Sequence, residues 1–328
     1  MRVLITGASG FLGRRLAQAL LAHAETALPQ TLRSRVTELV LTDRGAFEPD
    51  SSADIPVTVV AGDLADPAFC AHLAGQRFDS IFHLAASLTL DAEAAPEAAF
   101  AANVAAIGRL LPRQAGRRPR FVLASSIAVF GGRLPAVVDD DVRPRPATTY
   151  GTQKAIAELM LADMSRRGDV DARCLRLPIV LVRPGAATPA VSDRIAAIIR
   201  EPLSGRDVLC PLAGDTVIPI ASAGAVCRSL IALHDVSPEA LPAGRALNLP
   251  SLSTSIAEIA AAVGEVGGTD AGRIRIAPDP ALQAIVDGWP RRLVSSTASA
   301  LGLQADASVA DVIADHLANA KVMTHGRG

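Results

Sequence analysis

The chain has 328 residues and a formal net charge of −1 at pH 7, and half of its residues are hydrophobic although only 3% are aromatic. Charges of both signs are interspersed, which argues against a nucleic-acid partner or a polybasic membrane patch. No apolar run reaches the ~18 residues that would suggest a membrane span. The length allows one large domain or two, with a core of Ala, Val, Leu and Ile that suits a parallel sheet covered by helices.

The four cysteines, Cys70, Cys174, Cys210 and Cys227, lie in apolar contexts without CxxC spacing. This pattern predicts reduced, buried thiols and no metal site. The chain enters a predicted strand within two residues of its start, which leaves no room for a signal peptide. We therefore expect a cytoplasmic protein.

The first element is a β-branched strand at 2–6, followed by a glycine turn and then by an apolar helical repeat. A dinucleotide-binding fingerprint requires this order of strand, turn and helix. Gly7 would allow the tight turn, Gly10 a close approach of the backbone to a pyrophosphate, and Gly13 the packing of helix on strand. The helix start would attract the phosphate. A plain strand-to-helix turn could use the same glycines.

The second strand is predicted at 38–42 and ends at Asp43. An acidic residue at this position binds the ribose hydroxyls and repels a 2′-phosphate, which favours NAD over NADP. A polar insertion at 24–37 explains why Asp43 lies further from Gly13 than usual. Arg44 follows directly and could tolerate a phosphate, and Asp43 could also simply begin a turn.

Further strands are predicted at 57–60, 80–84 and 120–124. Asp63 and Leu64 follow the first of these and could flank an adenine. His83 lies on the second and is interpreted as a core histidine whose hydrogen bonds are satisfied. Ser125 and Ser126 follow the third, where parallel sheets bind ligands, although serines there could also cap a turn. A long Ala-rich helix is predicted at about 91–111.

Tyr150 is the only tyrosine of the chain, and Lys154, four residues later, is one of two lysines. Four residues are about one helical turn, so both side chains should share a face. An ammonium beside a phenol should lower the phenol pKa from ~10 and yield a general base. The alternative is a packed tyrosine with a solvated lysine nearby. The helix should begin after Thr148 or Thr149 and end near Gly168.

Beyond residue 180, prolines separate short elements. We predict helices at 192–200, 221–234, 254–266 and 306–320, and a strand at 246–249. The predicted fold is α/β, a doubly wound and mostly parallel Rossmann sheet with a small interleaved C-terminal α/β domain. Residues 1–177 would bind NAD, with 207–250 returning to that domain. Residues 178–206 and 251–322 would bind substrate, and 323–328 would be a frayed tail.

Several motifs occur in order: TGASGFLG at 6–13, GDL at 62–64, HLAA at 83–86, SSIAVFGG at 125–132, YGTQK at 150–154 and RLPIVLVRPG at 176–185. With Asp43 and Asn103, they resemble the extended short-chain dehydrogenase/reductase superfamily of the NAD-dependent epimerase/dehydratase type. The segments IIREPLSG at 198–205, ALNLPSLS at 246–253 and DGWPRR at 287–292 narrow the resemblance to its D-erythronate dehydrogenase branch.

The resemblance implies that Tyr150 is the base, that Lys154 binds the nicotinamide ribose and tunes Tyr150, and that Ser126 binds the substrate oxygen. Asn103 would support the active-site water and the lysine. Residues implied to contact NAD besides Asn103, Tyr150 and Lys154 are Gly7, Ser9, Gly10, Phe11, Leu12, Gly13, Asp43, Arg44, Asp63, Leu64, Leu84, Ala85, Ala86, Ser125, Leu177, Pro178, Ile179 and Val180.

The implied reaction is oxidation of a secondary alcohol of a small sugar acid. Arg183 could bind the carboxylate, or be a surface charge, while Ser87 and Thr89 could bind hydroxyls. The main alternative is a nucleotide-sugar epimerase or dehydratase. All eight phenylalanines lie at or before Phe130, so the second domain has few aromatic side chains on which the base of a nucleotide sugar could stack. A catalytically silent NAD(H) sensor would not need the Ser126, Tyr150 and Lys154 set. The helices predicted at 91–111 and 150–167 have outer faces rich in alanine, so two copies of the chain should pack closely there as a homodimer.

Overall fold

The computed structural model describes residues 1–21, 35–49, 55–111, 118–181 and 191–325. The chain divides into two compact units, and each is described by itself. The first unit comprises 1–129, 148–176 and 227–247. The second comprises 130–147, 177–226 and 248–328.

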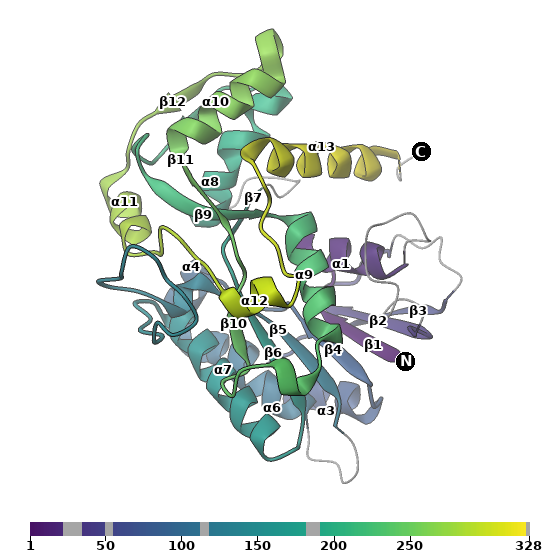
Figure 1. The fold of residues 1–328 in the computed structure, drawn as a ribbon. Coiled ribbons are helices and arrows are strands. Elements are labelled where there is room, and N and C mark those ends of the chain that lie inside the picture. Colours follow the sequence, from purple (N-terminus) through teal and green to yellow (C-terminus); the bar gives the residue numbers. More distant parts are fainter. Residues whose placement is uncertain (22–34, 50–54, 112–117, 182–190, 326–328) are drawn as a thin grey trace. The chain divides into compact units, whose positions relative to one another are not determined.

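The first unit is built on a seven-stranded sheet with the order β10-β6-β5-β4-β1-β2-β3 (Figure 1). The β1, β2, β3, β4 and β5 neighbours pair in parallel. Its strands are rich in Val, Leu and Ile, and apart from the edge strand β3 they are mostly buried, as parallel strands between helices require. The predicted Rossmann class is confirmed. The strands are β1 (Arg2–Thr6), β2 (Glu38–Asp43), β3 (Val57–Ala61), β4 (Ser80–His83), β5 (Arg120–Ser126), β6 (Asp171–Leu177) and β10 (Ala246–Asn248).

Helices cover both faces of this sheet. Figure 1 shows α3, α6 and α7 on one face and α1 and α9 on the other. Their bounds are α1 (Phe11–Leu21), α3 (Pro67–Gly75), α4 (Thr89–Ala94), α5 (Pro96–Phe100), α6 (Ala106–Leu110), α7 (Thr149–Arg166) and α9 (Ala223–Asp235), with a π-helical turn at Ala101–Ala105 and 3₁₀ turns at Ile127–Val129 and Pro238–Ala240.

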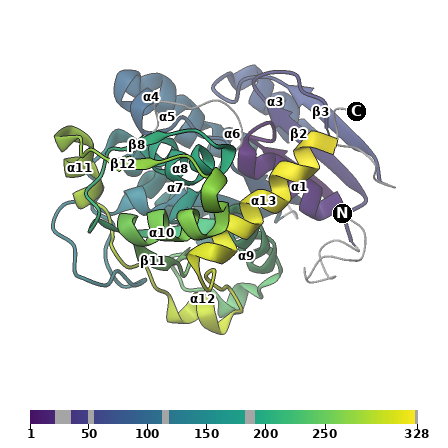
Figure 2. The ribbon, with the colours of Figure 1, turned by 90° about the horizontal axis from the view of Figure 1, so that it is seen from above.

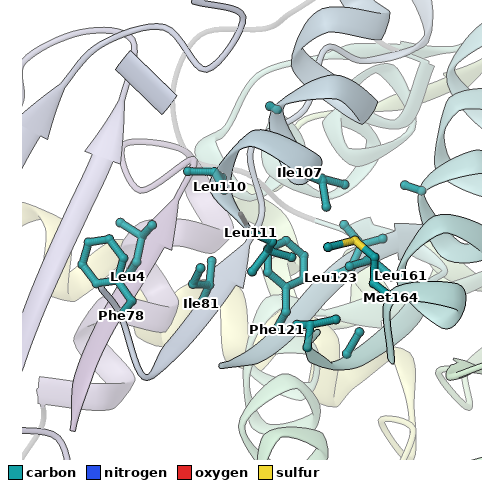
Figure 3. Packing of buried hydrophobic residues seen from close by; sticks show 14 of the residues in the cluster. Leu4, Phe78, Ile81, Ile107, Leu110, Leu111, Phe121, Leu123, Leu161 and Met164 are labelled. Atoms are coloured by element: carbon teal, nitrogen blue, oxygen red, sulfur yellow. The ribbon is translucent and has the colours of Figure 1, made fainter. Parts of the chain in front are cut away.

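The core under α3, α6 and α7 is mainly aliphatic, as the composition predicts. Leu4, Ile81 and Leu123 of the sheet lie in one buried cluster with Ile107 of α6 and Leu161 of α7 (Figure 3). Two phenylalanines, Phe78 and Phe121, complete the packing visible there.

The long helix predicted at about 91–111 is interrupted at Ala95. Helix α4 ends at Ala94, and Pro96 starts α5 at a position where its missing N–H costs nothing. The chain then widens into the π-helical turn Ala101–Ala105 before α6. Such π-bulges are often found at functional sites, and this one contains Asn103.

The second unit holds two small sheets, β11-β9-β7 and β12-β8. The predicted helices at 192–200, 254–266 and 306–320 correspond to α8, α10 and α13, and α10 begins with a capping box between Ser255 and Glu258. Figures 1 and 2 show α10 and α13 side by side. The elements are β7 (Ile179–Leu181), β8 (Val208–Cys210), β9 (Val217–Ser222), β11 (Leu252–Ser255), β12 (Ile274–Ile276), α8 (Val191–Arg200), α10 (Ile256–Gly267), α11 (Pro280–Asp287), α12 (Ser296–Ala300) and α13 (Val309–His325), with 3₁₀ turns at Pro202–Ser204 and Gly268–Asp270.

Strand β10 lies at the edge of the large sheet, beside β6. The last stretch of the first unit begins at Cys227, and residues 130–147 belong to the second unit. All four cysteines are buried and none forms a disulfide. Over the described residues, we find no helix that combines the length and apolarity needed to traverse a bilayer.

Candidate active site

The glycine turn after β1 is shaped by close backbone contacts. Gly7 has φ +70°, and a Cβ placed on it would lie 2.6 Å from the Ala85 backbone nitrogen. A Cβ on Gly13 would lie 2.2 Å from the Gly7 carbonyl oxygen, so α1 packs directly on the turn. A Cβ on Gly10, in contrast, would meet only the Gly7 oxygen, at 3.1 Å. The backbone at Gly10 is therefore open to an incoming group beside the start of α1.

Asp43 joins the end of β2 to this glycine turn. Its carboxylate accepts hydrogen bonds from the Ser9 backbone nitrogen at 3.0 Å, from the Ser9 hydroxyl at 2.7 Å and from the Arg44 backbone nitrogen at 2.8 Å. An open glycine backbone, a helix N-terminus and a carboxylate at the second strand's end are what a dinucleotide requires. The residues present at this turn thus fit NAD.

The end of β4 carries a hydrogen-bonded pair that links it to β1. His83 Nδ1 lies 2.9 Å from the Thr6 hydroxyl, which also accepts a 3.3 Å hydrogen bond from the Ala85 backbone nitrogen. His83 Nε2 is buried and has no partner among the described residues. The expectation of a fully satisfied histidine is therefore wrong, since the surrounding apolar strands offer only one partner. Burial, together with the charge of Lys154, lowers the pKa of His83 to about 3.

Tyr150, Ser126 and Lys154 come together at the exit of β5. Helix α7 begins at Thr149 because the Thr148 side chain caps it by accepting from the Gly151 nitrogen at 3.1 Å. The Ser126 side chain lies near Tyr150 and lowers the tyrosine pKa. Lys154, one turn later, places its Nζ 5.7 Å from the centre of the Tyr150 ring. The expected common face is thus found.

The pKa values of this pair are set mainly by burial. Burial raises the pKa of Tyr150 to about 12, and the Ser126 side chain offsets only part of that increase. The net direction is opposite to the lowering expected from Lys154. Burial also lowers the pKa of Lys154 to about 8. The Lys154 ammonium donates a 2.8 Å hydrogen bond to the Ala124 carbonyl oxygen.

Asn103 is held by the chain on three sides. Its Oδ1 accepts from the Ser87 backbone nitrogen at 2.8 Å, and its Nδ2 donates to the Ser87 carbonyl at 2.9 Å and to Gln153 Oε1 at 2.7 Å. Both amide hydrogens are then used, and one acceptor position of Oδ1 remains. Gln153 itself donates to the Pro96 carbonyl at 3.1 Å. Asn103 therefore fixes the loop after β4 against α7.

A buried polar group behind Lys154 was not foreseen from the sequence. Glu158 accepts a 2.5 Å hydrogen bond from the Ser125 hydroxyl and a bidentate pair of hydrogen bonds from the Arg176 guanidinium. The Ser125 side chain, expected to face the cofactor, is instead engaged by this carboxylate. The one available signal was that Glu158 continues the four-residue spacing of Tyr150 and Lys154.

The sequence profile of the NAD dependent epimerase/dehydratase family matches residues 3–246. The chain belongs to this family. A relative named D-erythronate dehydrogenase, from Cupriavidus necator, is 40% identical over 98% of this chain and 99% of its own length. The resemblance stated above is thereby confirmed, and the chain is an NAD-dependent dehydrogenase of the extended short-chain type.

Solved structures of the family have the same fold. The nucleoside-diphosphate-sugar epimerase from Agrobacterium tumefaciens has a TM-score of 0.90 and 33% identity, covering 97% of this chain and 93% of that one. The holo form of a GalE-like L-threonine dehydrogenase from Cupriavidus necator has a TM-score of 0.84 and 27% identity, covering 97% and 99%. The family neighbours thus include both dehydrogenases and an epimerase.

The other residues predicted to contact NAD or substrate lie after β3, after β4 and in the second unit. Asp63 bonds the Ala65 nitrogen at 2.8 Å beside the buried Leu64, after β3. Ser87 and Thr89 are partly exposed after β4. The residues predicted to cover the nicotinamide, Leu177, Pro178, Ile179 and Val180, belong to the second unit, in which Leu177 and Ile179 are buried. Arg183 lies outside the described residues.

Proposed function

We propose that this enzyme oxidises a secondary alcohol of a small sugar acid, of which D-erythronate is the first candidate, with NAD as the hydride acceptor. The observation that carries the proposal is the grouping of Tyr150, Ser126 and Lys154, in which the Lys154 nitrogen lies 5.7 Å from the centre of the Tyr150 ring and bonds the strand that ends at Ser126. The choice of substrate class rests on the relative named D-erythronate dehydrogenase, which aligns with nearly the whole chain.

Tyr150 is proposed to take the proton of the substrate hydroxyl as a general base. Ser126 would hold the substrate oxygen, because the Ala128 nitrogen donates to its hydroxyl at 3.1 Å and fixes its orientation beside Tyr150. NAD⁺, when bound, supplies the carbon that accepts the hydride and a positive charge on its ring. That charge and the Lys154 ammonium would bring the pKa of Tyr150 down from about 12.

The substrate side of the proposal uses groups at the carboxyl end of the first unit's sheet. Ser87 and Thr89 follow β4 and are proposed to bind hydroxyls of the sugar acid. A guanidinium binds a carboxylate in two parallel hydrogen bonds, and Arg183 is our candidate for that contact.

A nucleotide-sugar epimerase is the second candidate, because a structure of that name shares 33% identity with this chain. A nucleotide diphosphate needs a place for its base, which aromatic side chains commonly provide. After Phe130 the chain has only Tyr150 and Trp289 as aromatic residues, and Tyr150 belongs to the catalytic set. This distribution favours a small substrate. A silent NAD(H) sensor is the least supported, because it would not need the Ser126–Tyr150 pair.

The deciding experiment incubates the purified enzyme with NAD and a panel of C4–C6 aldonates, L-threonine and a nucleotide sugar, and follows the absorbance of reduced nicotinamide. We expect NAD reduction with erythronate, and far slower reduction with Tyr150→Phe. Epimerisation of the nucleotide sugar without net reduction would overturn the proposal in favour of the epimerase. Reduction with L-threonine alone would contradict the substrate class.

We also propose that the enzyme is a cytoplasmic homodimer. Apolar side chains on α4, α5 and α7 are exposed: Leu90 by 42%, Phe100 by 44%, Ile156 by 37% and Leu159 by 73%. These helices contact one another, and exposed apolar residues on neighbouring helices favour an interface. Light scattering should give the mass of two chains, and Leu159→Arg should shift it toward one. Cell fractionation of the native source tests the location.

A further inference from the structure

Three side chains at four-residue intervals on α7 contact three consecutive residues at the end of β5. Tyr150 lies near Ser126, Lys154 donates to the Ala124 carbonyl at 2.8 Å, and Glu158 accepts from Ser125 at 2.5 Å. The first two contacts belong to the proposed catalytic set. The third has no role in the reaction as described so far.

The carboxylate of Glu158 is almost fully buried, since the residue is 4% exposed. Burying a carboxylate destabilises the folded protein unless the group is paired and hydrogen-bonded. Arg176, on β6, is 6% exposed and donates to both carboxylate oxygens. An apolar pair of similar volume would often be no less stable. The pair therefore suggests a function other than stability.

We propose that Glu158 is a positioning residue for the dehydrogenase reaction, which holds the end of β5 against α7 through Ser125 and places a carboxylate one helical turn from the Lys154 ammonium. Ser125 precedes Ser126 directly, so its hydrogen bond to Glu158 limits how far the Ser126 hydroxyl can move from Tyr150. This inference rests on the proposed function, and it assigns Glu158 no contact with the reacting atoms.

The electrostatic part follows from the groups that face Lys154. These are Tyr150 and Glu158 on α7, Cys174 on β6 and His83 on β4, and Arg176 on β6 pairs with Glu158. Burial lowers the pKa of Lys154, while Cys174 and Glu158 raise it. Burial raises the pKa of Cys174 itself well above its usual range, so this thiol is neutral near pH 7. Glu158 is then the negative charge of this group.

The test reads the protonation of Lys154 directly. Lysine labelled with ¹³C at Cε gives two signals in this chain, from Lys154 and Lys321, and Lys154→Arg identifies them. We expect the Lys154 midpoint to move to lower pH in Glu158→Gln, because this change removes a negative charge and leaves the Arg176 guanidinium unbalanced. An unchanged midpoint would overturn the electrostatic part. This titration needs neither cofactor nor substrate, so its outcome is independent of the proposed function.

The positioning part is tested by turnover of erythronate. Glu158→Gln should lower kcat roughly ten- to a hundredfold, as small misplacements at a reacting centre do, with little change in KM for NAD. In a plot of kcat against pH, the decline of the Glu158→Gln variant at high pH should begin at a lower pH than in the wild type. This shift should match the shift of the Lys154 midpoint. Asp163→Asn is the matched control, since it removes the same charge from an exposed position on the same helix and should change neither quantity.

The Ser125→Ala variant separates the positioning role of Glu158 from its electrostatic role. It also replaces Glu158→Gln as the test if that variant does not fold. It removes the hydroxyl that Glu158 holds but leaves the charge in place. We expect a lower kcat with an unshifted Lys154 midpoint. A Ser125→Ala enzyme with wild-type kcat would overturn the positioning role of Glu158.

Discussion

The Lys154 ammonium donates to the Ala124 carbonyl at 2.8 Å while its nitrogen lies 5.7 Å from the centre of the Tyr150 ring. The strand that carries Ser126 is thereby tied to the helix that carries the proposed base. Because the Tyr150 pKa is about 12 from burial, the phenol needs further positive charge to act near neutral pH. The ring charge of bound NAD⁺ is the source we propose, which would couple base activation to cofactor binding.

Removal of the phenol hydroxyl should abolish most turnover. We expect Tyr150→Phe to lower kcat roughly 10²- to 10⁴-fold, which is the usual contribution of a general base. NAD affinity, measured by calorimetry, should change little because the ring remains. Turnover close to wild type would show that another group takes the proton.

Activity should decline as pH rises through the Lys154 pKa. That pKa is about 8, lowered from 10.5 by burial, so the ammonium is present below pH 8 and is lost above it. Lys154→Arg keeps a positive charge that does not titrate in this range, so its alkaline limb should lie at higher pH than that of the wild type. Initial rates in matched-ionic-strength buffers check this. Coinciding limbs would mean that a different group titrates.

Replacing His83 should cost little stability. His83→Leu loses one hydrogen bond to Thr6 but also removes the buried Nε2 that has no partner, so the two effects largely offset. We expect the free energy of unfolding, from urea titration, to fall by less than about 1 kcal/mol. The wild-type pH profile should show no histidine step near pH 6.5, because the His83 pKa is about 3. A loss well above that amount would indicate a buried partner for Nε2.

Much of the fold and part of the site could be predicted because their signals are local in the sequence. The glycine turn, Asp43 at a strand end and the spacing of Tyr150 and Lys154 each need only a few residues. Gln153, Glu158 and Arg176 were missed because their roles depend on partners 18 to 50 or more residues away. The Tyr150 pKa was misjudged because sequence shows a nearby charge but not the burial that outweighs it.

Loss of the Asn103 amide should loosen the loop after β4. Asn103→Ala leaves the Ser87 nitrogen without its acceptor and Gln153 Oε1 without its donor, and buried unpaired groups cost about 1–3 kcal/mol each. We expect the free energy of unfolding to fall by about 2–4 kcal/mol and the backbone amide of Ser87 to exchange faster with deuterium. Asn103→Asp keeps the acceptor toward Ser87 and should retain slow exchange there. Equal exchange in both variants would assign the loop's rigidity to other contacts.

Two glycines of the turn after β1 should respond differently to the same added methyl group. In Gly13→Ala the Cβ would lie 2.2 Å from the Gly7 oxygen, a backbone atom that cannot move without shifting the strand, so the protein should be destabilised. In Gly10→Ala the nearest atom is 3.1 Å away, so the fold should persist. The methyl group would instead occupy the open backbone face that we assign to the pyrophosphate and weaken NAD binding. Thermal unfolding and calorimetric titration with NAD compare the two, and unimpaired NAD binding by a folded Gly10→Ala would place the phosphates elsewhere.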